Sequence, residues 1–394
     1  MKHYVIILAF LSFITTMKAQ MYVSTNATVF IDSEAILSVV GDAKNDGTIE
    51  NSGTIQLKGY LDNQNKLNSS GTFILSGLNQ TIYHKNNILS TLICNGGGIK
   101  KLTNSITITK ELELNDGLLK PLDTTSLLLK STANTSLGNA DSYVDGKLFT
   151  EGLSNRYFPI GKGGLFAPCE LQSIKGDSII VYGMDVVNPT SLTLTKGKLT
   201  QGVLQTRYWK MTPKVGTYKQ ANLSLSYSSD DTFANPDMIG VVQANDSVGS
   251  YDMLKKNPDI TSKISGTGLL YSSSSSSRPI TKKYFTLGDY VLADMSLFYL
   301  PNALSKHALD SNDRAIRVYG DVFAKEGFSF VISNQWGNVV YKTTSVKELS
   351  EKGWDGTNIR TQRHETTGQY LYVLKGVTLN GEAFEKAGSI WIIE

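Results

Sequence analysis

Carboxylates on a repeated β surface are the residues of this chain that could cleave a polysaccharide. Such a site needs two or more carboxylates, or a carboxylate with Arg or Lys, on one face of the surface. The candidates in the most regular part of the sequence are Asp42, Asp46, Glu50 and Asp62. Only Glu50 and Asp62 share a position in the six-residue repeat described below, and their separation of two repeats places them on different faces. These acids therefore do not predict a catalytic site.

Metal-binding and nucleophile motifs are also absent from the sequence. His84, His307 and His364 lie far from one another and from any cysteine, so the spacing of zinc ligands is missing and each is expected at the surface. The acidic run at 310–313 lacks the glycine and the distal carboxylate of a calcium loop, which favours a polar turn. No G-x-S-x-G motif or P-loop occurs. The sequence thus predicts no catalytic residue, no cofactor and no metal site.

Glycine recurs every sixth residue between positions 41 and 78, and this repeat indicates the elements that carry the acids. Glycine stands at 41, 47, 53, 59, 71 and 77, with Asn65 in the one gap. Two residues after each of the first six repeat starts comes Ala43, Ile49, Ile55, Leu61, Leu67 or Phe73. Because six is a multiple of the two-residue period of a strand and fits the helical period poorly, the repeat predicts short strands.

Three such units would close an 18-residue coil of a β-solenoid, with glycine or asparagine at the corners in a positive-φ conformation. Asn45, Asn51 and Asn63 share one position in the repeat, as a ladder at a corner requires. The alternative is a meander in which the same glycines form hairpin turns. We favour a solenoid over residues 20–138, with longer and less regular coils after the strict period ends.

The first 19 residues have the pattern of a secretory signal peptide. Lys2 and His3 precede an apolar run that is too short for a membrane helix, and small residues precede Gln20. Cleavage is expected after Ala19. The sequence therefore predicts export across the inner membrane.

Charge and cysteine content exclude several classes of protein. Loss of Lys2 and Lys18 with the signal peptide lowers the formal charge from +3 to +1, so nothing favours nucleic acid or an anionic membrane as a partner. Cys94 and Cys169 are the only cysteines, and whether they are free or paired stays open. Abundant glycine and short β-branched runs predict an extracellular all-β protein.

Two further regions follow the solenoid. Residues 139–295 have longer, aromatic-rich strands that predict a β-sandwich. Residues 296–394 alternate in polarity: Phe328, Phe330 and Ile332 face one way, and Tyr370 and Tyr372 repeat the pattern. This predicts an immunoglobulin-like β-sandwich at the end of the chain.

The last region also carries ordered motifs. They are Pro301-Asn302-Ala303, Asn334-Gln335-Trp336-Gly337, Trp354-Asp355-Gly356-Thr357 and Gly368-Gln369-Tyr370. Together they resemble the gliding-motility-associated C-terminal domain, the type B sorting signal of the type 9 secretion system of Bacteroidetes. The resemblance suggests that the two tryptophans help to form a recognition surface, whereas their size and flanking turn residues favour the core for both.

The resemblance implies a function without catalysis. The chain would be an exported cell-surface or outer-membrane-associated protein with a structural or adhesive role. It would pass through a SprA-type translocon and dock on a SprF/PorP-type or PorV-type outer-membrane barrel. One alternative is a resident subunit of the translocon or gliding apparatus, held by an uncleaved sorting-like domain. A second is a β-helix enzyme that acts on polysaccharides.

Overall fold

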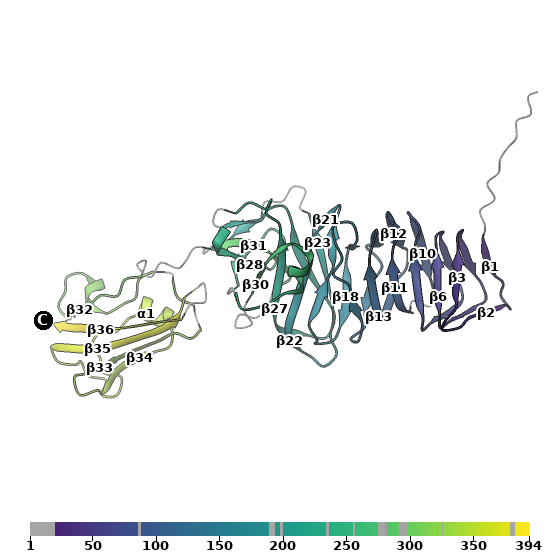
Figure 1. Cartoon of the computed structure of the whole chain (residues 1–394). Coiled ribbons are helices and arrows are strands. Elements are labelled where there is room, and N and C mark those ends of the chain that lie inside the picture. The colour runs from purple at the N-terminus through teal and green to yellow at the C-terminus, as the bar shows by residue number, and fades with distance from the viewer. Residues whose placement is uncertain are drawn as a thin grey trace, which may run out of the picture.

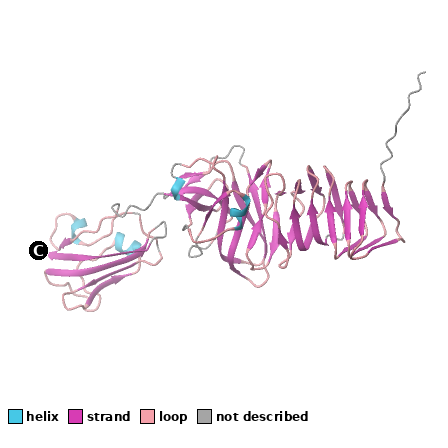
Figure 2. Cartoon of the chain, in the orientation of Figure 1, coloured by secondary structure: helices cyan, strands magenta, loops and turns pink. Residues whose placement is uncertain are grey.

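The computed structural model describes residues 20–394 apart from 86–87, 189–193, 198–199, 234–235, 255–256, 275–279, 281, 291–297, 321, 325 and 379–382. The expected signal peptide lies outside the described residues. Nearly all regular structure is β, as predicted (Figures 1 and 2). The helices within the described ranges are the short η1 (Pro236–Met238), η2 (Lys263–Thr267), η4 (Ser311–Arg314) and α1 (Val346–Glu351). No helix in the described part of the chain is long and apolar enough to cross a membrane.

An N-terminal β-solenoid of about seven turns confirms the main prediction from the repeat. Its strands stack in parallel, and the register advances 18 residues per coil, from Ala43 to Leu61 and from Thr48 to Lys66. The first sheet contains β1 (Met21–Val23), β4 (Ala43–Asn45), β7 (Leu61–Asn63), β10 (Gln80–His84), β12 (Ile99–Leu102), β14 (Leu118–Pro121), β17 (Val144–Asp145) and β20 (Ile160–Lys162). The second contains β2 (Thr28–Ile31), β5 (Thr48–Asn51) and β8 (Lys66–Ser69), and the third contains β3 (Ile36–Val39), β6 (Thr54–Leu57), β9 (Thr72–Leu75), β11 (Ile88–Cys94), β13 (Ile106–Leu114), β15 (Leu127–Leu129) and β18 (Leu148–Glu151). The apolar residue of each repeat points inward, and Ile49, Ile55 and Leu67 are at most 4% exposed.

The glycines of the repeat have a different role from the predicted one. Those at 47, 53, 59, 71 and 77 are not among the residues with positive φ. A Cβ atom built on Gly53 would lie 2.1 Å from the carbonyl oxygen of Asp32 and 2.3 Å from that of Ala35, both on the preceding coil. The repeat needs glycine because the backbones of successive coils approach too closely for a side chain.

Buried polar side chains stack between coils at the corners. Asn45 donates to Asn63 over 2.6 Å, and Asn51 donates to the hydroxyl of Ser69 over 3.0 Å. The predicted asparagine ladder is therefore present. His84, expected at the surface, is instead fully buried above Asn63, because the coil after Leu61 is 21 residues long and places residue 84 at the ladder position. His307 and His364 are exposed, as expected.

The solenoid changes shape after β9 and then joins the middle region. The second sheet ends at β8, and the longer β11 and β13 cover two faces of the coil. Parallel pairing continues through position 138 to β17 and β20. One hydrophobic core runs from Val23 to Leu287, so the solenoid and the middle region share an interior. Figure 1 shows the strands of the two regions directly next to each other.

Antiparallel sheets form the middle region. The larger one adds β23 (Val181–Val187), β26 (Tyr208–Val215), β31 (Tyr284–Tyr290), β28 (Ile239–Ala244) and β29 (Ser250–Met253) to β18, and the smaller one contains β19 (Arg156–Phe158), β22 (Cys169–Gly176), β27 (Tyr218–Tyr227) and β30 (Leu270–Ser273). Cys94 and Cys169 are both free and buried, and burial raises the pKa of each thiol. Neither thiol is poised as a reactive thiolate.

The C-terminal unit is built on one five-stranded sheet with a separate core. The strand order is β32 (Ala303–Ser305), β36 (Ala383–Ile393), β35 (Gly368–Val377), β33 (Ser329–Ser333) and β34 (Val339–Thr343). The predicted alternation is confirmed, because Phe328, Phe330, Ile332, Tyr370 and Tyr372 are all buried. The layer that covers this core consists of loops and α1, with a bridge between Ile316 and Trp354. The side chains on the second face of the sheet are half-buried or exposed.

Candidate functional site

A tight turn between β33 and β34 displays Trp336. The side-chain oxygen of Asn334 accepts hydrogen bonds from the backbone N–H groups of Trp336 (3.2 Å) and Asn338 (3.0 Å). Gly337 supplies the positive φ of 79° that the turn requires. The indole of Trp336 is 75% exposed, so its predicted place in the core is wrong. Hydrogen bonds from the turn backbone to the Asn334 side chain hold this turn, and the indole takes no part in them. The turn therefore keeps a large apolar side chain in solvent.

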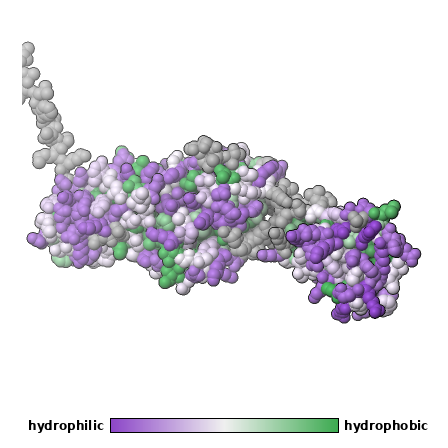
Figure 3. Space-filling model, turned by 180° about the vertical axis from the view of Figure 1, so that it is seen from behind, coloured by the Kyte–Doolittle hydropathy of each residue, from purple (hydrophilic) through white to green (hydrophobic). Residues whose placement is uncertain are grey.

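Three more apolar side chains are exposed at the same end of the sheet. Ser333, the last residue of β33, pairs with Leu371, and Gln369 pairs with Trp391. Leu371 is 55% exposed, Trp391 47% and Ile393 49%. We call Trp336, Leu371, Trp391 and Ile393 the tip patch. In Figure 3 most of the visible surface of the C-terminal unit is hydrophilic.

Sequence reasoning identified only Trp336 of these four residues. The alternation that buries Tyr370 and Tyr372 places Leu371 on the opposite face, and the same rule applies to Trp391 beside buried Ile390 and Ile392. Large apolar residues at the alternate, outward-facing positions of these strands are the signal in the sequence that predicts the patch. The sequence motif contains mainly the inward-facing residues.

Most other residues of the expected recognition signature build the unit itself. Trp354 is 1% exposed, packs edge-on against Tyr370 at 5.5 Å and donates its indole N–H to the carbonyl of Thr357, so its predicted place in the core is confirmed. Asp355 accepts from the backbone N–H of Thr357, and Gly356 has a φ of 86°. These residues fix the loop that follows Trp354.

A hydrogen-bond network then ties this loop to β35. Tyr370 donates to Oε2 of Glu365 over 3.1 Å, and Asn358 donates to Oε1 of the same carboxylate over 2.6 Å. Burial raises the pKa of Tyr370, which keeps its hydroxyl protonated as the donor. Gly368 begins β35 opposite Ile392. The signature residues near Tyr370 are therefore structural.

The start of the signature lies beside the tip patch. The carbonyl of Asn302 accepts the backbone N–H of Trp391 over 2.8 Å, and β32 pairs in parallel with the end of β36 from the next residue onward. Pro301 is partly exposed just before this strand. The segment at 301–305 thus forms one border of the sheet that carries Trp391 and Ile393.

Each acid of the repeat has its own local partner. Asp42 accepts from the backbone of Tyr60, Asp46 from the hydroxyl of Tyr22, and Asp62 from the side chain of Gln64. Glu50 binds Lys66 at 2.8 Å, and hydrogen bonds from Lys66 and Asn68 lower its pKa. A general acid needs a raised pKa. This arrangement of the four acids fits polar pairs at the surface.

The acidic run at 310–313 also has local partners, because the Asp310 side chain caps η4 by accepting a hydrogen bond from the backbone N–H of Asn312.

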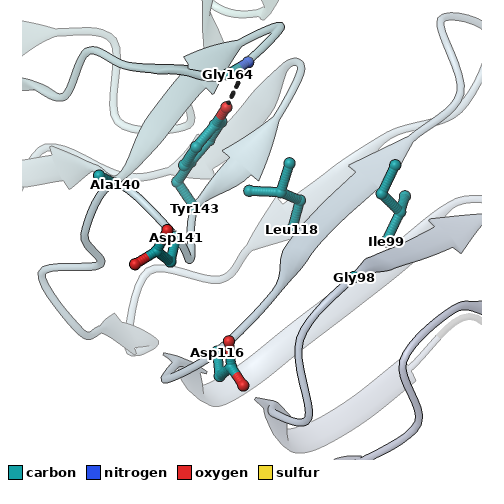
Figure 4. A pocket seen from close by; sticks show the side chains of 8 residues that line it. All are labelled: Gly98, Ile99, Asp116, Leu118, Ala140, Asp141, Tyr143 and Gly164. Carbon is teal, nitrogen blue, oxygen red and sulfur yellow. Dashed lines mark hydrogen bonds between the residues drawn. The ribbon is translucent and has the colours of Figure 1, made fainter.

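A shallow hollow of about 360 Å³ lies on the outer surface beside β12, β14, β17 and β20, and Figure 4 shows it closely. Its lining residues are Gly98, Ile99, Asp116, Leu118, Ala140, Asp141, Tyr143 and Gly164. The hydroxyl of Tyr143 accepts a hydrogen bond from the backbone N–H of Gly164 over 3.0 Å, which fixes the ring in the wall. Two carboxylates next to apolar Ile99 and Leu118 can accept hydrogen bonds from hydroxyl or amine groups.

Within the described residues, no group of three or more His, Cys, Asp or Glu side chains is placed to hold a metal ion. The tip patch and the hollow are therefore considered as candidate sites for binding. A scan against protein-family models, a search of curated proteins and a search of solved structures each found no match.

Proposed function

We propose that the chain is a non-enzymatic, exported surface protein in which the solenoid is a stiff spacer and the C-terminal unit docks on an outer-membrane barrel. In this proposal the type 9 secretion system exports it, and its role at the surface is structural or adhesive. The observation that carries the proposal is the tip patch, four exposed apolar residues at one end of a unit with its own core.

The composition of the patch supports a protein partner. Tryptophan is enriched among the residues that contribute most to binding at protein interfaces, and such residues cluster near the centre of the interface. The two tryptophans are accompanied by Leu371 and Ile393, while the neighbouring Gln369 and Ser389 are uncharged. Exposed apolar side chains that gather at one end of a unit are typical of interaction sites in soluble proteins.

Loss of the patch should weaken docking without unfolding the unit. We expect the triple variant Trp336→Ala, Leu371→Ser, Trp391→Ala to bind a purified SprF/PorP-type or PorV-type barrel at least about tenfold more weakly. Biolayer interferometry with the barrel in detergent measures this. Trp336→Ala alone should change the free energy of unfolding by less than about 0.5 kcal/mol, because its indole is exposed.

Ile179 supplies the matched control, because it is 68% exposed in the middle region. Ile179→Ser removes an exposed apolar side chain outside the C-terminal unit and should bind the barrel like the unmodified chain. Equal binding by the triple variant and this control would exclude the tip patch as the docking surface. No binding by the unmodified chain to either barrel would contradict the docking proposal itself.

The alternative of a resident subunit differs in the fate of the sorting-like unit. A resident subunit keeps residues 296–394 and is recovered uncleaved and stoichiometric with the translocon or barrel. An exported cargo is recovered in a processed form from the medium or the cell surface. Mass spectrometry of the purified outer-membrane complexes distinguishes the two.

The hollow gives the polysaccharide-enzyme alternative a better candidate pair than the repeat does. Asp116 and Asp141 line one concavity, whereas the acids of the repeat have separate partners. If the mature chain cleaves any polysaccharide, Asp116→Asn together with Asp141→Asn should abolish the cleavage. Cleavage that survives this pair of substitutions would exclude the hollow as its site.

A further inference from the structure

A ladder of three buried polar side chains runs from coil to coil along one corner of the solenoid. Asn45, Asn63 and His84 lie on β4, β7 and β10, one above the other, and each is at most 1% exposed. Asn45 Nδ2 donates to Asn63 Oδ1 over 2.6 Å, and Asn63 Nδ2 lies 2.9 Å from His84 Nδ1. His84 Nε2 lies 3.1 Å from the carbonyl oxygen of Ile88.

The direction of hydrogen bonding in this ladder is set at both ends by the backbone. At one end, the N–H of Gly47 donates to Asn45 Oδ1, which leaves Asn45 Nδ2 to face Asn63. Asn63 then turns its own Nδ2 toward His84, so Nδ1 of the imidazole must accept. At the other end, a carbonyl oxygen requires that Nε2 donate. These partners fit a neutral imidazole with its proton on Nε2.

A second proton on the ring conflicts with every member of the ladder. A proton on Nδ1 would face the N–H₂ group of Asn63, donor against donor. Rotating the Asn63 amide would move the conflict to Asn45, and rotating Asn45 would oppose the N–H of Gly47, which is fixed backbone. Burial of the ring acts in the same direction and lowers the pKa of His84.

Nearby charged groups do not compensate this conflict. The ionisable residues on the surrounding strands and turns are Asp62, Lys66, Tyr83, Lys85, Lys100 and Lys101. Strand alternation directs Asp62, Tyr83 and Lys101 to the outer surface, where each is at least partly exposed. Lys66 forms an ion pair with Glu50. Lys100 is buried at the opposite end of β12, opposite Gln80, and donates to the carbonyl of Gly77.

We propose that His84 is a pH-sensitive switch in the solenoid wall: its protonation in mild acid opens the coils around residues 61–104. The neutral ring joins two coils, and the charged ring is accepted only after they separate and water reaches it. The spacer would then open more often in mild acid than at neutral pH.

Hydrogen exchange on the full chain tests this proposal. An opened coil restores the ordinary histidine pKa of 6.5, so between pH 7.5 and pH 5.0 the opening equilibrium of 61–104 should rise after correction for intrinsic exchange, by up to about 30-fold where the ring in the closed coil stays neutral throughout. The C-terminal unit, with exposed His307 and His364, should not change. His84→Asn continues the asparagine ladder without a titrating group and should remove the pH dependence.

Two results would overturn the proposal. One is equal pH dependence in the unmodified chain and in His84→Asn. The other comes from the unmodified chain alone: an NMR titration in which the His84 ring protonates at pH 6.5 or above while 61–104 stays protected. The second measurement needs no variant, so it decides the question even if His84→Asn fails to fold.

Discussion

Gly53→Ala is expected to lower the free energy of unfolding of the solenoid by about 3 kcal/mol or more. The added methyl group would sit 2.1 Å from the carbonyl oxygen of Asp32 and 2.3 Å from that of Ala35. Both are backbone atoms of the preceding coil, so relief requires two coils to move apart. Gly71 stacks on Gly53 in the same way, and a Cβ built on Gly71 would lie 2.1 Å from the Gly53 carbonyl oxygen. Any side chain at these stacked glycine positions would therefore clash with the preceding coil.

Asn65→Ala is the matched control for this substitution. Asn65 occupies the same position in the six-residue repeat but already carries a Cβ, so alanine adds no atom there. The variant loses one exposed hydrogen bond to the carbonyl of Asp46 and should cost about 1 kcal/mol or less. Urea unfolding followed by far-UV circular dichroism compares the two variants. Similar losses in both would show that close coil contact is not the reason for glycine.

The repeat predicted the architecture, but it did not show why glycine is needed. A period of six predicts strands and a coil of 18 residues, and the pairing of Ala43 with Leu61 confirms it. Positive φ and close backbone contact both require glycine, and they leave the same mark on a sequence. They differ only in what lies next to the missing Cβ, which depends on the neighbouring coil.

The positions of His84 and Trp336 were missed for two different physical reasons. The strict period ends near Leu78, so the 21-residue step from Asn63 to His84 has no periodic signal in the sequence. Trp336 has the size of a core residue, but the Asn334 and Gly337 bonds of its turn decide its place. By contrast, the alternation around Phe330 and Tyr370 predicted their burial, because the two-residue period of a strand acts locally.

The second large effect is expected at Arg207 and Asp231, a buried ion pair that joins the two sheets of the middle region. Arg207 precedes β26 and Asp231 follows β27, and their side chains are only 5% and 8% exposed. The contact is bidentate, at 2.8 Å and 2.6 Å. The guanidinium also donates to the carbonyl of Ser226 and lies 5.4 Å from the ring centre of Trp209.

Asp231→Asn should cost about 3–5 kcal/mol at pH 7, because it leaves the Arg207 charge buried without its partner. Burial alone would raise the pKa of Asp231, but hydrogen bonds from Arg207 and from the Ser228 backbone outweigh it, and the pKa is lowered. A carboxyl with a lowered pKa stabilises the fold above its ordinary value of 3.8. That stability is lost as the pH falls through the folded-state value. Measurement at pH 7 therefore records the whole contribution.

A double-mutant cycle separates the pair from the packing around it. The double variant Arg207→Met, Asp231→Leu removes both charges and keeps apolar volume. Its loss of unfolding free energy should therefore be smaller than the sum of the losses measured for Arg207→Met alone and Asp231→Leu alone. Glu351→Gln breaks the exposed pair with Lys347 and should change stability by less than about 0.5 kcal/mol. Additive losses at Arg207 and Asp231 would mean that each side chain acts through its own packing. A shortfall of more than about 1 kcal/mol would mean that the cost of each single change comes from the charge it strands between the two sheets.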